Sequence, residues 1–233
     1  MQLSKRLQAV ADMVTPGSRL ADVGTDHGYV PIWLYEAGRV SSAIAMDLRE
    51  GPLDRARENI RIHQLGEHIE TRLSDGLHQL QSGEVDSIVI AGMGGMLMRK
   101  ILTDGQAVLP SIKELILQPQ SDLDAVRIYL KEQGFCICKE DMIFEDGKYY
   151  PILKAVHGEN TDDRQIWFLY GRLLLESRHP VLEKYLLKEK KQHEKLLAQL
   201  RFTETETGRH RREELAGEDR LIDEALAYYK ENM

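Results

Sequence analysis

Four aspartates lie at or just beyond the ends of apolar, strand-like segments in the first third of the chain. Asp22 and Asp26 belong to the stretch LADVGTDHGYVP, in which a buried strand runs into a glycine-containing loop and a helix start. Asp47 ends the segment SSAIAMD, and Asp75 ends HIETRLSD. Carboxylates accept hydrogen bonds from hydroxyl and amino groups and attract cations. The spacing therefore predicts a nucleoside site, with Asp47 on the ribose and Asp75 on an adenine amino group.

The loop after the first strand is unsuited to a pyrophosphate. A dinucleotide-binding loop needs G-x-G-x-x-G, because its middle glycine lets the backbone approach the phosphates. Gly24 and Gly28 are present, but Asp26 occupies the middle position. A carboxylate about 4 Å from a phosphate charge costs about 4 kcal/mol at a surface-like dielectric, which disfavours NAD, FAD and ATP. S-adenosylmethionine has no phosphate and carries two cationic groups, so it is the predicted cofactor. Helix capping is the alternative; it would explain any one of these aspartates more easily than all four.

A second cluster of special residues is the glycine-rich stretch IAGMGGMLMRK, which follows the fourth strand-like segment. Gly92 and the two glycines after Met93 leave the backbone bare, so a planar group can approach main-chain amides and carbonyls. The fifth strand-like segment ends in LQPQ, which places Gln118 and Pro119 at the same edge. The alternatives are a tight turn with methionines partly in the core and an ordinary turn at Pro119.

These residues need a scaffold that brings the ends of several strands together. Strand-like segments alternate with amphipathic helical segments from residue 1 to about 157, and the last two strands flank Asp146-Gly147, a strong hairpin signal. The pattern predicts an α/β fold with an open, mostly parallel sheet, helices on both faces and a terminal antiparallel hairpin. Ligands of such sheets bind outside the carboxyl ends of the strands, where the four aspartates and the glycine-rich stretch are expected.

The composition changes in residues 158–233, which contain 14 Lys/Arg and 16 Asp/Glu and show no strand pattern. Leucines recur there at three- and four-residue steps. The simplest interpretation is two antiparallel helices that form a coiled-coil-like hairpin, with Pro180 kinking or dividing the first helix. The polar segment FTETETGRHRR, broken by Gly208, is expected to connect them. We therefore predict two domains, 1–157 for cofactor binding and catalysis and 158–233 as a helical hairpin.

The overall composition excludes several classes of protein. The chain has 233 residues and a formal charge of −7, so nucleic acid could bind only through local basic patches. No apolar run approaches the roughly 20 residues that span a bilayer, and the N-terminus lacks a signal peptide's apolar stretch, which predicts a cytoplasmic protein without membrane contact. Cys136 and Cys138 would point to opposite faces of a strand, so we expect reduced thiols and no metal site.

The motifs ADVGTDHGYVP, AMD, IAGMGG and LQPQ, in this order and followed by a helical hairpin, closely resemble the bacterial tRNA (adenine(22)-N(1))-methyltransferase family. The resemblance covers essentially the whole chain. It implies a class I (Rossmann-like) methyltransferase fold, S-adenosylmethionine as donor, and methyl transfer to N1 of adenine 22 in the D-arm region of tRNA. The cofactor contacts that it implies are Asp22, Gly24, His27, Asp47 and Asp75, with Gly28 in the same loop and Gly92 and Met93 between donor and substrate.

The residues suit this chemistry. Adenine N1 has an in-plane lone pair, so the enzyme must mainly align nitrogen, methyl carbon and sulfur. Methylation leaves positive charge on the purine, which a carboxylate can stabilise before accepting a proton. Asp26 is the candidate for this role, although it could instead hold the methionine ammonium or cap the following helix. Tyr29 could stack on the base or hydrogen-bond to it.

Basic side chains gather in several segments of this acidic protein, and some are expected to contact phosphates. The alternative is solvated helix faces. Two rival functions stay open: a methyltransferase for a small molecule or a protein, and an interaction module that merely binds cofactor. The oligomeric state is also open, and a monomer is compatible with the sequence. The predicted substrate-binding residues are Gln118, Pro119, Arg55, Arg99, Lys190, Lys191 and Arg211.

Overall fold

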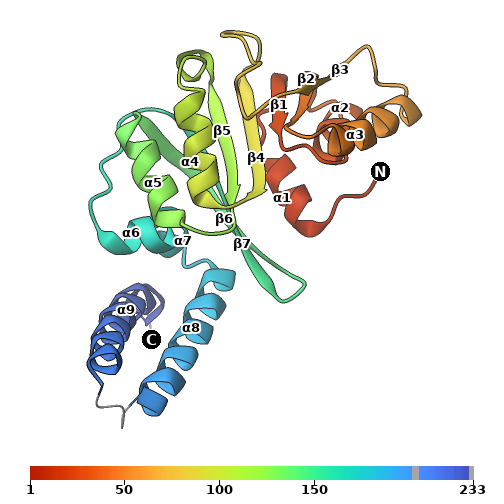
Figure 1. Cartoon of the computed structure of the whole chain (residues 1–233). Helices are drawn as coiled ribbons and strands as arrows, with labels where there is room; N and C mark the ends of the chain where they lie inside the picture. The colour runs from red at the N-terminus through yellow and green to blue at the C-terminus, as the bar shows by residue number, and fades with distance from the viewer. Residues whose placement is uncertain (201–204, 231–233) are drawn as a thin grey trace. The chain divides into compact units, whose positions relative to one another are not determined.

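The computed structural model describes residues 1–200 and 205–230, and the chain divides into two compact units, Met1–Asn160 and Thr161–Met233 (Figure 1). The division falls close to the predicted change of composition after His157. The first unit holds the sheet, and the regular elements in the described part of the second are all helices. No helix among the described residues has the length and apolar character that a bilayer crossing requires.

The first unit is built on a seven-stranded sheet with the order β3-β2-β1-β4-β5-β7-β6. Strands β1 to β5 pair in parallel, whereas β7 runs antiparallel to both β5 and β6. The predicted open, mostly parallel sheet with a terminal antiparallel hairpin is therefore confirmed. The strands are β1 (Ser18–Val23), β2 (Val40–Asp47), β3 (Ile69–Leu73), β4 (Ser87–Met93), β5 (Glu114–Pro119), β6 (Phe135–Glu145) and β7 (Lys148–His157).

Helices cover both faces of this sheet (Figure 1). Each parallel crossover brings the chain back to start the next strand at the same edge, so all five parallel strands end together at the opposite edge. A short 3₁₀ helix, η1 (Leu109–Ser111), precedes β5. The helices of this unit are α1 (Lys5–Met13), α2 (Tyr29–Glu36), α3 (Glu50–Ile62), α4 (Gly95–Asp104) and α5 (Leu123–Glu132).

The sheet has a hydrophobic core on each face, which explains why the sequences of the parallel strands are continuously apolar. Neighbouring strand residues point to opposite faces. In β1, Leu20 belongs to the core under α1 and α2, while Ala21 belongs to the core under α4 and α5. In β4, Val89 belongs to the core under α1 and α2, and Ile88 belongs to the core under α4 and α5. The hairpin turn at Asp146-Gly147 has positive φ at both residues, 49° and 76°, as the predicted two-residue connection requires.

A buried acid, Glu114, connects several segments at the edge of the sheet where the parallel strands begin. Glu114, 4% exposed, accepts hydrogen bonds from Thr15 (2.8 Å from the backbone N) and Ser87 (2.6 Å) and pairs with Lys154 (2.6 Å). Burial by itself would raise the pKa of Glu114, but the bonds from Lys154, Ser87 and Thr15 hold that pKa below its usual value. The segment after α1 is thereby anchored to β4, β5 and β7.

The second unit departs from the predicted pair of helices. It contains α6 (Gln165–Tyr170), α7 (Arg172–Glu176), α8 (Pro180–Leu200) and α9 (Glu206–Lys230). Gly171, at φ 92°, separates α6 from α7, and Pro180 begins α8, so of the two predicted alternatives it divides the helical segment and does not kink it. The fixed φ of proline and its missing N–H suit a first helical position.

The long helices α8 and α9 pack side by side in the predicted hairpin. Leu182, Leu186 and Ile222 are buried, but Leu196 on the same predicted stripe is 42% exposed, so the apolar seam does not extend along the whole of α8. Gly208, which the sequence places in the connecting segment, is instead buried in the first turn of α9. Part of the predicted connection, 201–204, lies outside the described residues.

Candidate active site

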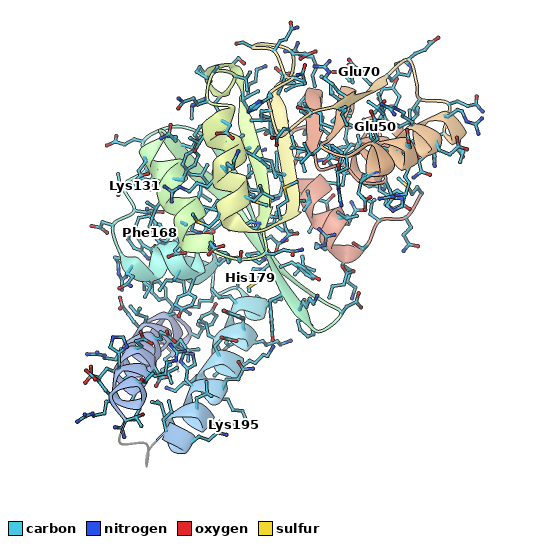
Figure 2. All side chains as sticks on the ribbon, in the orientation of Figure 1. Glu50, Glu70, Lys131, Phe168, His179 and Lys195 are labelled. Atoms are coloured by element: carbon cyan, nitrogen blue, oxygen red, sulfur yellow. The ribbon has the colours of Figure 1, made fainter. Side chains whose placement is uncertain are left out.

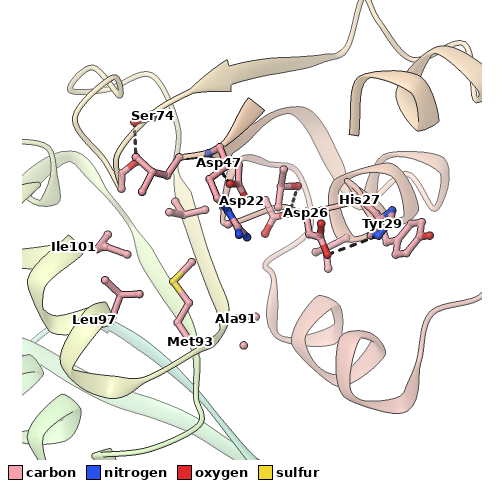
Figure 3. A pocket seen from close by; sticks show the side chains of 18 of the residues that line it. Asp22, Asp26, His27, Tyr29, Asp47, Ser74, Ala91, Met93, Leu97 and Ile101 are labelled. Carbon is pink, nitrogen blue, oxygen red and sulfur yellow. Dashed lines mark hydrogen bonds and ion pairs between the residues drawn. The ribbon is translucent and has the colours of Figure 1, made fainter. Parts of the chain in front are cut away.

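A cavity of about 630 Å³ lies at the carboxyl ends of β1, β2 and β4, where ligands of parallel sheets bind. Figure 3 shows Asp22, Asp26 and Asp47 on one side of it, with the apolar side chains of Leu97 and Ile101 from α4 across from them. The cavity therefore has a polar, acidic side and an apolar side. The predicted site residues that line it are Asp22, Gly24, Asp26, His27, Tyr29, Asp47, Asp75, Gly92 and Met93.

The loop after β1 takes its shape from left-handed backbone conformations at Gly24 (φ 75°), Asp26 (φ 48°) and Gly28 (φ 70°). A Cβ on Gly24 would overlap the terminal methyl of Met93, a flexible side-chain end that can move, so it is the left-handed backbone conformation that favours glycine at this position. Gly28 is the residue that precedes α2, and it is not among the cavity-lining residues. Its part in cofactor binding stays a prediction.

Asp22 is a buried carboxylate at the end of β1, 5% exposed. The hydroxyl of Thr25 donates a hydrogen bond of 2.6 Å to it. Burial raises the pKa of Asp22 to about 6; the Thr25 hydrogen bond opposes this rise, and the Asp47 carboxylate adds to it. The ionised form is thus disfavoured by burial and by a like charge, and a cation in the cavity would favour it.

The acids from the next two strands occupy different environments. Asp47, 9% exposed, accepts a hydrogen bond of 2.9 Å from the backbone N–H of Arg49. Asp75 is exposed on the loop after β3. That loop is held by Ser74, which is buried and whose hydroxyl donates to the carbonyl of Gly76 at 2.9 Å. Both carboxylates line the cavity, as the strand-end spacing predicts.

Asp26 and Arg55, predicted to act separately on the base and on the RNA, pair with each other. The Asp26 Oδ1 to Arg55 Nη2 distance is 2.5 Å, and both side chains are about half exposed. His27 Nε2 lies 3.7 Å from Asp26 Oδ2, and the His27 ring stacks on Tyr29 with centroids 5.0 Å apart. Arg55 is not among the residues that line the cavity, although its partner is.

The glycine-rich stretch bends the end of β4. Gly92 has φ 78°, and the pairing of β4 with β5 shifts register between Ala91 and Met93. The bend brings the Met93 side chain into the cavity against Gly24, so the methionine is neither fully in the core nor fully exposed. Met98 by contrast is completely buried, in line with the alternative that some of these methionines belong to the core.

The helix α1 contributes to the cavity through Arg6 and Leu7, which sequence reasoning missed. The amphipathic pattern predicts this helix but carries no sign that it reaches the strand ends. Gln118 and Pro119 are buried in β5 and are not among the residues that line the cavity, whereas the next residue, Gln120, is. Thr25, Ser74 and Ala91, which lie within the segments expected at the strand ends, also line the cavity. The other lining residues that were missed are Val23, Val30, Leu48, Arg49, Gly76, Leu97 and Ile101.

The remaining predicted substrate contacts are surface cations with different partners. Lys190 forms an ion pair with Asp223, and Arg211 lies 2.9 Å from Glu214, each pair within the second unit. Lys191 and Arg99 are exposed. Arg211 is within α9 and not at the predicted turn. Figure 2 shows the many side chains that extend from α8 and α9, Lys195 among them.

Cys136 and Cys138 are free thiols. Within the described ranges, histidine, cysteine and acidic side chains form no group of three or more that could hold a metal ion.

Comparison with known proteins identifies the family. Residues 3–153 match the family model described as a methyltransferase domain. The tRNA (adenine(22)-N(1))-methyltransferase of Bacillus subtilis is 32% identical over 97% of this chain and 98% of its own length. The crystal structure of the B. subtilis m1A22 tRNA methyltransferase TrmK has a TM-score of 0.88 at 32% identity and covers 97% of this chain and 99% of that chain.

A Streptococcus pneumoniae relative, solved in complex with S-adenosyl-L-methionine, is 37% identical, with a TM-score of 0.88, and covers 97% of this chain and all of that chain. The likeness thus extends through both units and includes the strand ends that form the cavity. The chain belongs to the tRNA (adenine(22)-N(1))-methyltransferase family.

Proposed function

We propose that this protein transfers a methyl group from S-adenosylmethionine to N1 of adenine 22 in the D-arm of tRNA. The observation that carries the proposal is 32% identity to the B. subtilis enzyme over 97% of the chain. The relative in complex with S-adenosyl-L-methionine supports the choice of donor. A tRNA substrate also locates the proposed reaction in the cytoplasm.

The charges of the cavity suit this donor. When bound, S-adenosylmethionine would supply an electrophilic methyl group on a sulfonium, and it brings no phosphate to the acidic wall. Asp22 is proposed to favour its cationic groups, because a buried carboxylate gains most from a nearby positive charge. Asp47 is proposed to accept from ribose hydroxyls and Asp75 from the adenine amino group. The loop of Gly24, His27 and Gly28 would surround the methionine part.

The residues at the bend of β4 are proposed to set the position of the acceptor base. Gly92 leaves the backbone bare there, and Met93 forms an apolar wall against which a base can pack. Tyr29, 39% exposed, offers an aromatic face for stacking. Because N1 attacks through its own lone pair, alignment by these groups is the main contribution required of the protein.

Asp26 is proposed to stabilise the positive charge that develops on the purine and then to accept a proton. Its carboxylate is about half exposed and forms an ion pair with Arg55. Exposed pairs of this kind contribute about 1 kcal/mol or less, so exchange of partners is inexpensive. A tRNA phosphate that binds Arg55 would release Asp26 toward the base, which reconciles the two predicted roles.

The predicted basic residues remain the proposed RNA contacts, and they differ in whether an acidic side chain already pairs with them. Lys191 and Arg99 have no acidic partner among the residues that the structure describes, so each carries a full charge available to a phosphate. Lys190 and Arg211 would first have to leave Asp223 and Glu214. The distinction predicts unequal contributions from neighbouring lysines.

Incubation with unmodified tRNA and S-adenosylmethionine should produce 1-methyladenosine, because the whole chain aligns with an enzyme of that activity. Mass spectrometry of the digested nucleosides measures the product, and primer extension locates it. A transcript with guanine at position 22 is the matched control and should stay unmethylated. Methyl transfer only to metabolites or protein, with none to tRNA, would overturn the proposed function.

Donor affinity should fall as the pH drops through about 6, because protonation of Asp22 removes the charge that favours a cation. With a pKa of about 6, the ionised fraction at pH 5 is roughly one tenth, so the Kd should rise about tenfold between pH 8 and pH 5. Calorimetric titration measures this. Asp22→Asn keeps an acceptor for the Thr25 hydroxyl but should bind weakly at every pH. A pH dependence retained in Asp22→Asn would remove Asp22 from this role.

Replacement of the proposed catalytic carboxylate, Asp26→Asn, should lower kcat by a factor of about 10²–10⁴ while the donor Kd changes little. Single-turnover methylation of tRNA and calorimetry give the two values. Asp54→Asn, an exposed acid on α3 that pairs with Arg57, is the matched control and should retain its rate. Retention of wild-type kcat in Asp26→Asn would assign the proton to another acceptor.

Lys191→Gln should weaken tRNA binding and reduce the slope of log K against log salt by about 0.9, the value for one phosphate contact. Lys190→Gln is the matched neighbour and should change the slope less, because Asp223 already neutralises Lys190. Filter binding from low to moderate salt measures both slopes. If neither variant alters the slope, α8 is not part of the RNA-binding surface.

A further inference from the structure

Arg6 places a positive charge in the cavity that no acid neutralises. The side chain comes from α1 and lines the cavity next to Leu7. Its Nη1 donates a hydrogen bond of 3.0 Å to the side-chain oxygen of Gln118, which is a neutral partner. Within residues 1–200 and 205–230, no carboxylate forms an ion pair with this guanidinium. Arg55, by contrast, is neutralised by Asp26 at the same end of the sheet.

Several contacts hold Arg6 in place. The carboxylate of Glu145, from the tip of the β6–β7 hairpin, accepts the backbone N–H groups of Lys5 (2.7 Å) and Arg6 (3.3 Å). The guanidinium lies over the ring of Tyr150, 5.5 Å from its centroid. Gln118 is completely buried, and its amide nitrogen donates to the carbonyl of Pro119 at 3.2 Å. The orientation of the cation is thus preorganised by α1, β5 and the hairpin.

This cation lies beside the bare backbone at the bend of β4. A Cβ built on Gly92 would be 3.6 Å from Arg6 Nη1 and 3.8 Å from the side-chain nitrogen of Gln120. Two groups of donors therefore border the same glycine. In the sheet order, β4 and β5 lie on one side of β1, whereas β2 and β3, which lead to Asp47 and Asp75, lie on the other. Arg6 thus lies on the opposite side of the cavity from Asp47 and Asp75, whereas the other arginine of the lining, Arg49, lies just after β2.

A fixed guanidinium at this place would repel both cations of the proposed reaction, the donor's sulfonium and the methylated purine. It is useful only if an anionic group of a reactant faces it. A guanidinium binds carboxylates and phosphates through paired N–H groups, and such charge-assisted bonds are strong. The proposed donor offers one carboxylate, on its methionine part, and the proposed acceptor offers the phosphates of the target nucleotide.

We propose that Arg6 binds an oxyanion of a bound reactant at the β4–β5 side of the cavity, and that Gln118 is the positioning residue that aims it. The proposal rests on the proposed function for the identity of the reactants. It also gives the predicted substrate-binding residue Gln118 a different role: the buried amide acts through Arg6, because a neutral acceptor orients the guanidinium without cancelling its charge.

The test compares Arg6→Gln with Lys5→Gln, a loss of the same charge one residue away on a side chain outside the cavity lining. Calorimetry measures the Kd of S-adenosylhomocysteine and of 5′-methylthioadenosine, which lacks the amino acid part and its carboxylate. Filter binding measures the Kd of tRNA and its salt dependence. Arg6→Lys and Gln118→Glu are the second variants. Arg6→Lys keeps the positive charge but loses the paired N–H donors of the guanidinium, and Gln118→Glu neutralises Arg6 in place.

If Arg6 holds the donor's carboxylate, Arg6→Gln raises the Kd of S-adenosylhomocysteine about 10- to 100-fold and leaves that of 5′-methylthioadenosine unchanged. If it holds a phosphate, both nucleoside affinities stay unchanged, while tRNA binding weakens and its salt slope falls by about one. Arg6→Lys and Gln118→Glu should weaken the same ligand as Arg6→Gln does, whichever of the two it is.

Equal behaviour of Arg6→Gln and Lys5→Gln with all three ligands would overturn the proposal. So would an equal loss for 5′-methylthioadenosine and S-adenosylhomocysteine, because that result indicates a changed cavity and not a lost oxyanion contact. The calorimetric comparison needs neither tRNA nor turnover. The calorimetric comparison can therefore support a role for Arg6 even if the protein does not methylate tRNA. Conversely, a negative result for Arg6 leaves the 1-methyladenosine assay unaffected.

Discussion

The buried carboxylate of Asp22 is the constraint around which the site is built. Its burial at the end of β1, together with the nearby Asp47, raises its pKa to about 6 and makes the ionised form costly. A structural role would be served better by an apolar residue or by a paired acid such as Glu114, which Lys154 neutralises at the opposite edge of the sheet. An acid left without a cation at a ligand-binding edge indicates that its partner arrives with the ligand.

The backbone around Asp22 is shaped to keep that position open. Left-handed conformations at Gly24, Asp26 and Gly28 turn the chain sharply away from β1, and the bend at Gly92 does the same for β4. The two bends meet where Met93 contacts Gly24, so the space on the acidic side depends on a glycine from one strand end and a flexible side chain from another. Flexible methionine suits a wall that must fit a bound base.

Charge compensation separates the functional candidates from the rest of the surface. Most of the described arginines, including Arg19, Arg72 and Arg172, pair with acids and contribute little to a net field. Arg6 differs, because its partner is the neutral Gln118. An acidic protein can therefore hold an anionic reactant at one point inside a cavity whose other side is lined by carboxylates. Whether an anion can bind at a given point depends on the ion pairs around that point, and the formal charge of −7 does not reveal these pairs.

The sequence by itself determined the alternation of strands and helices, the hairpin at Asp146-Gly147, and the gathering of Asp22, Asp47 and Asp75 at one edge, because hydrophobic period and parallel-strand topology are local or follow general rules. It did not reveal that Asp26 pairs with Arg55 or that the buried Gln118 accepts a hydrogen bond from Arg6, and it placed Gly208 in a connecting segment where α9 has already begun. Those features depend on contacts between segments far apart in the chain. Only the tertiary structure decided them, because a side chain's partner and burial are set by packing that no local pattern encodes.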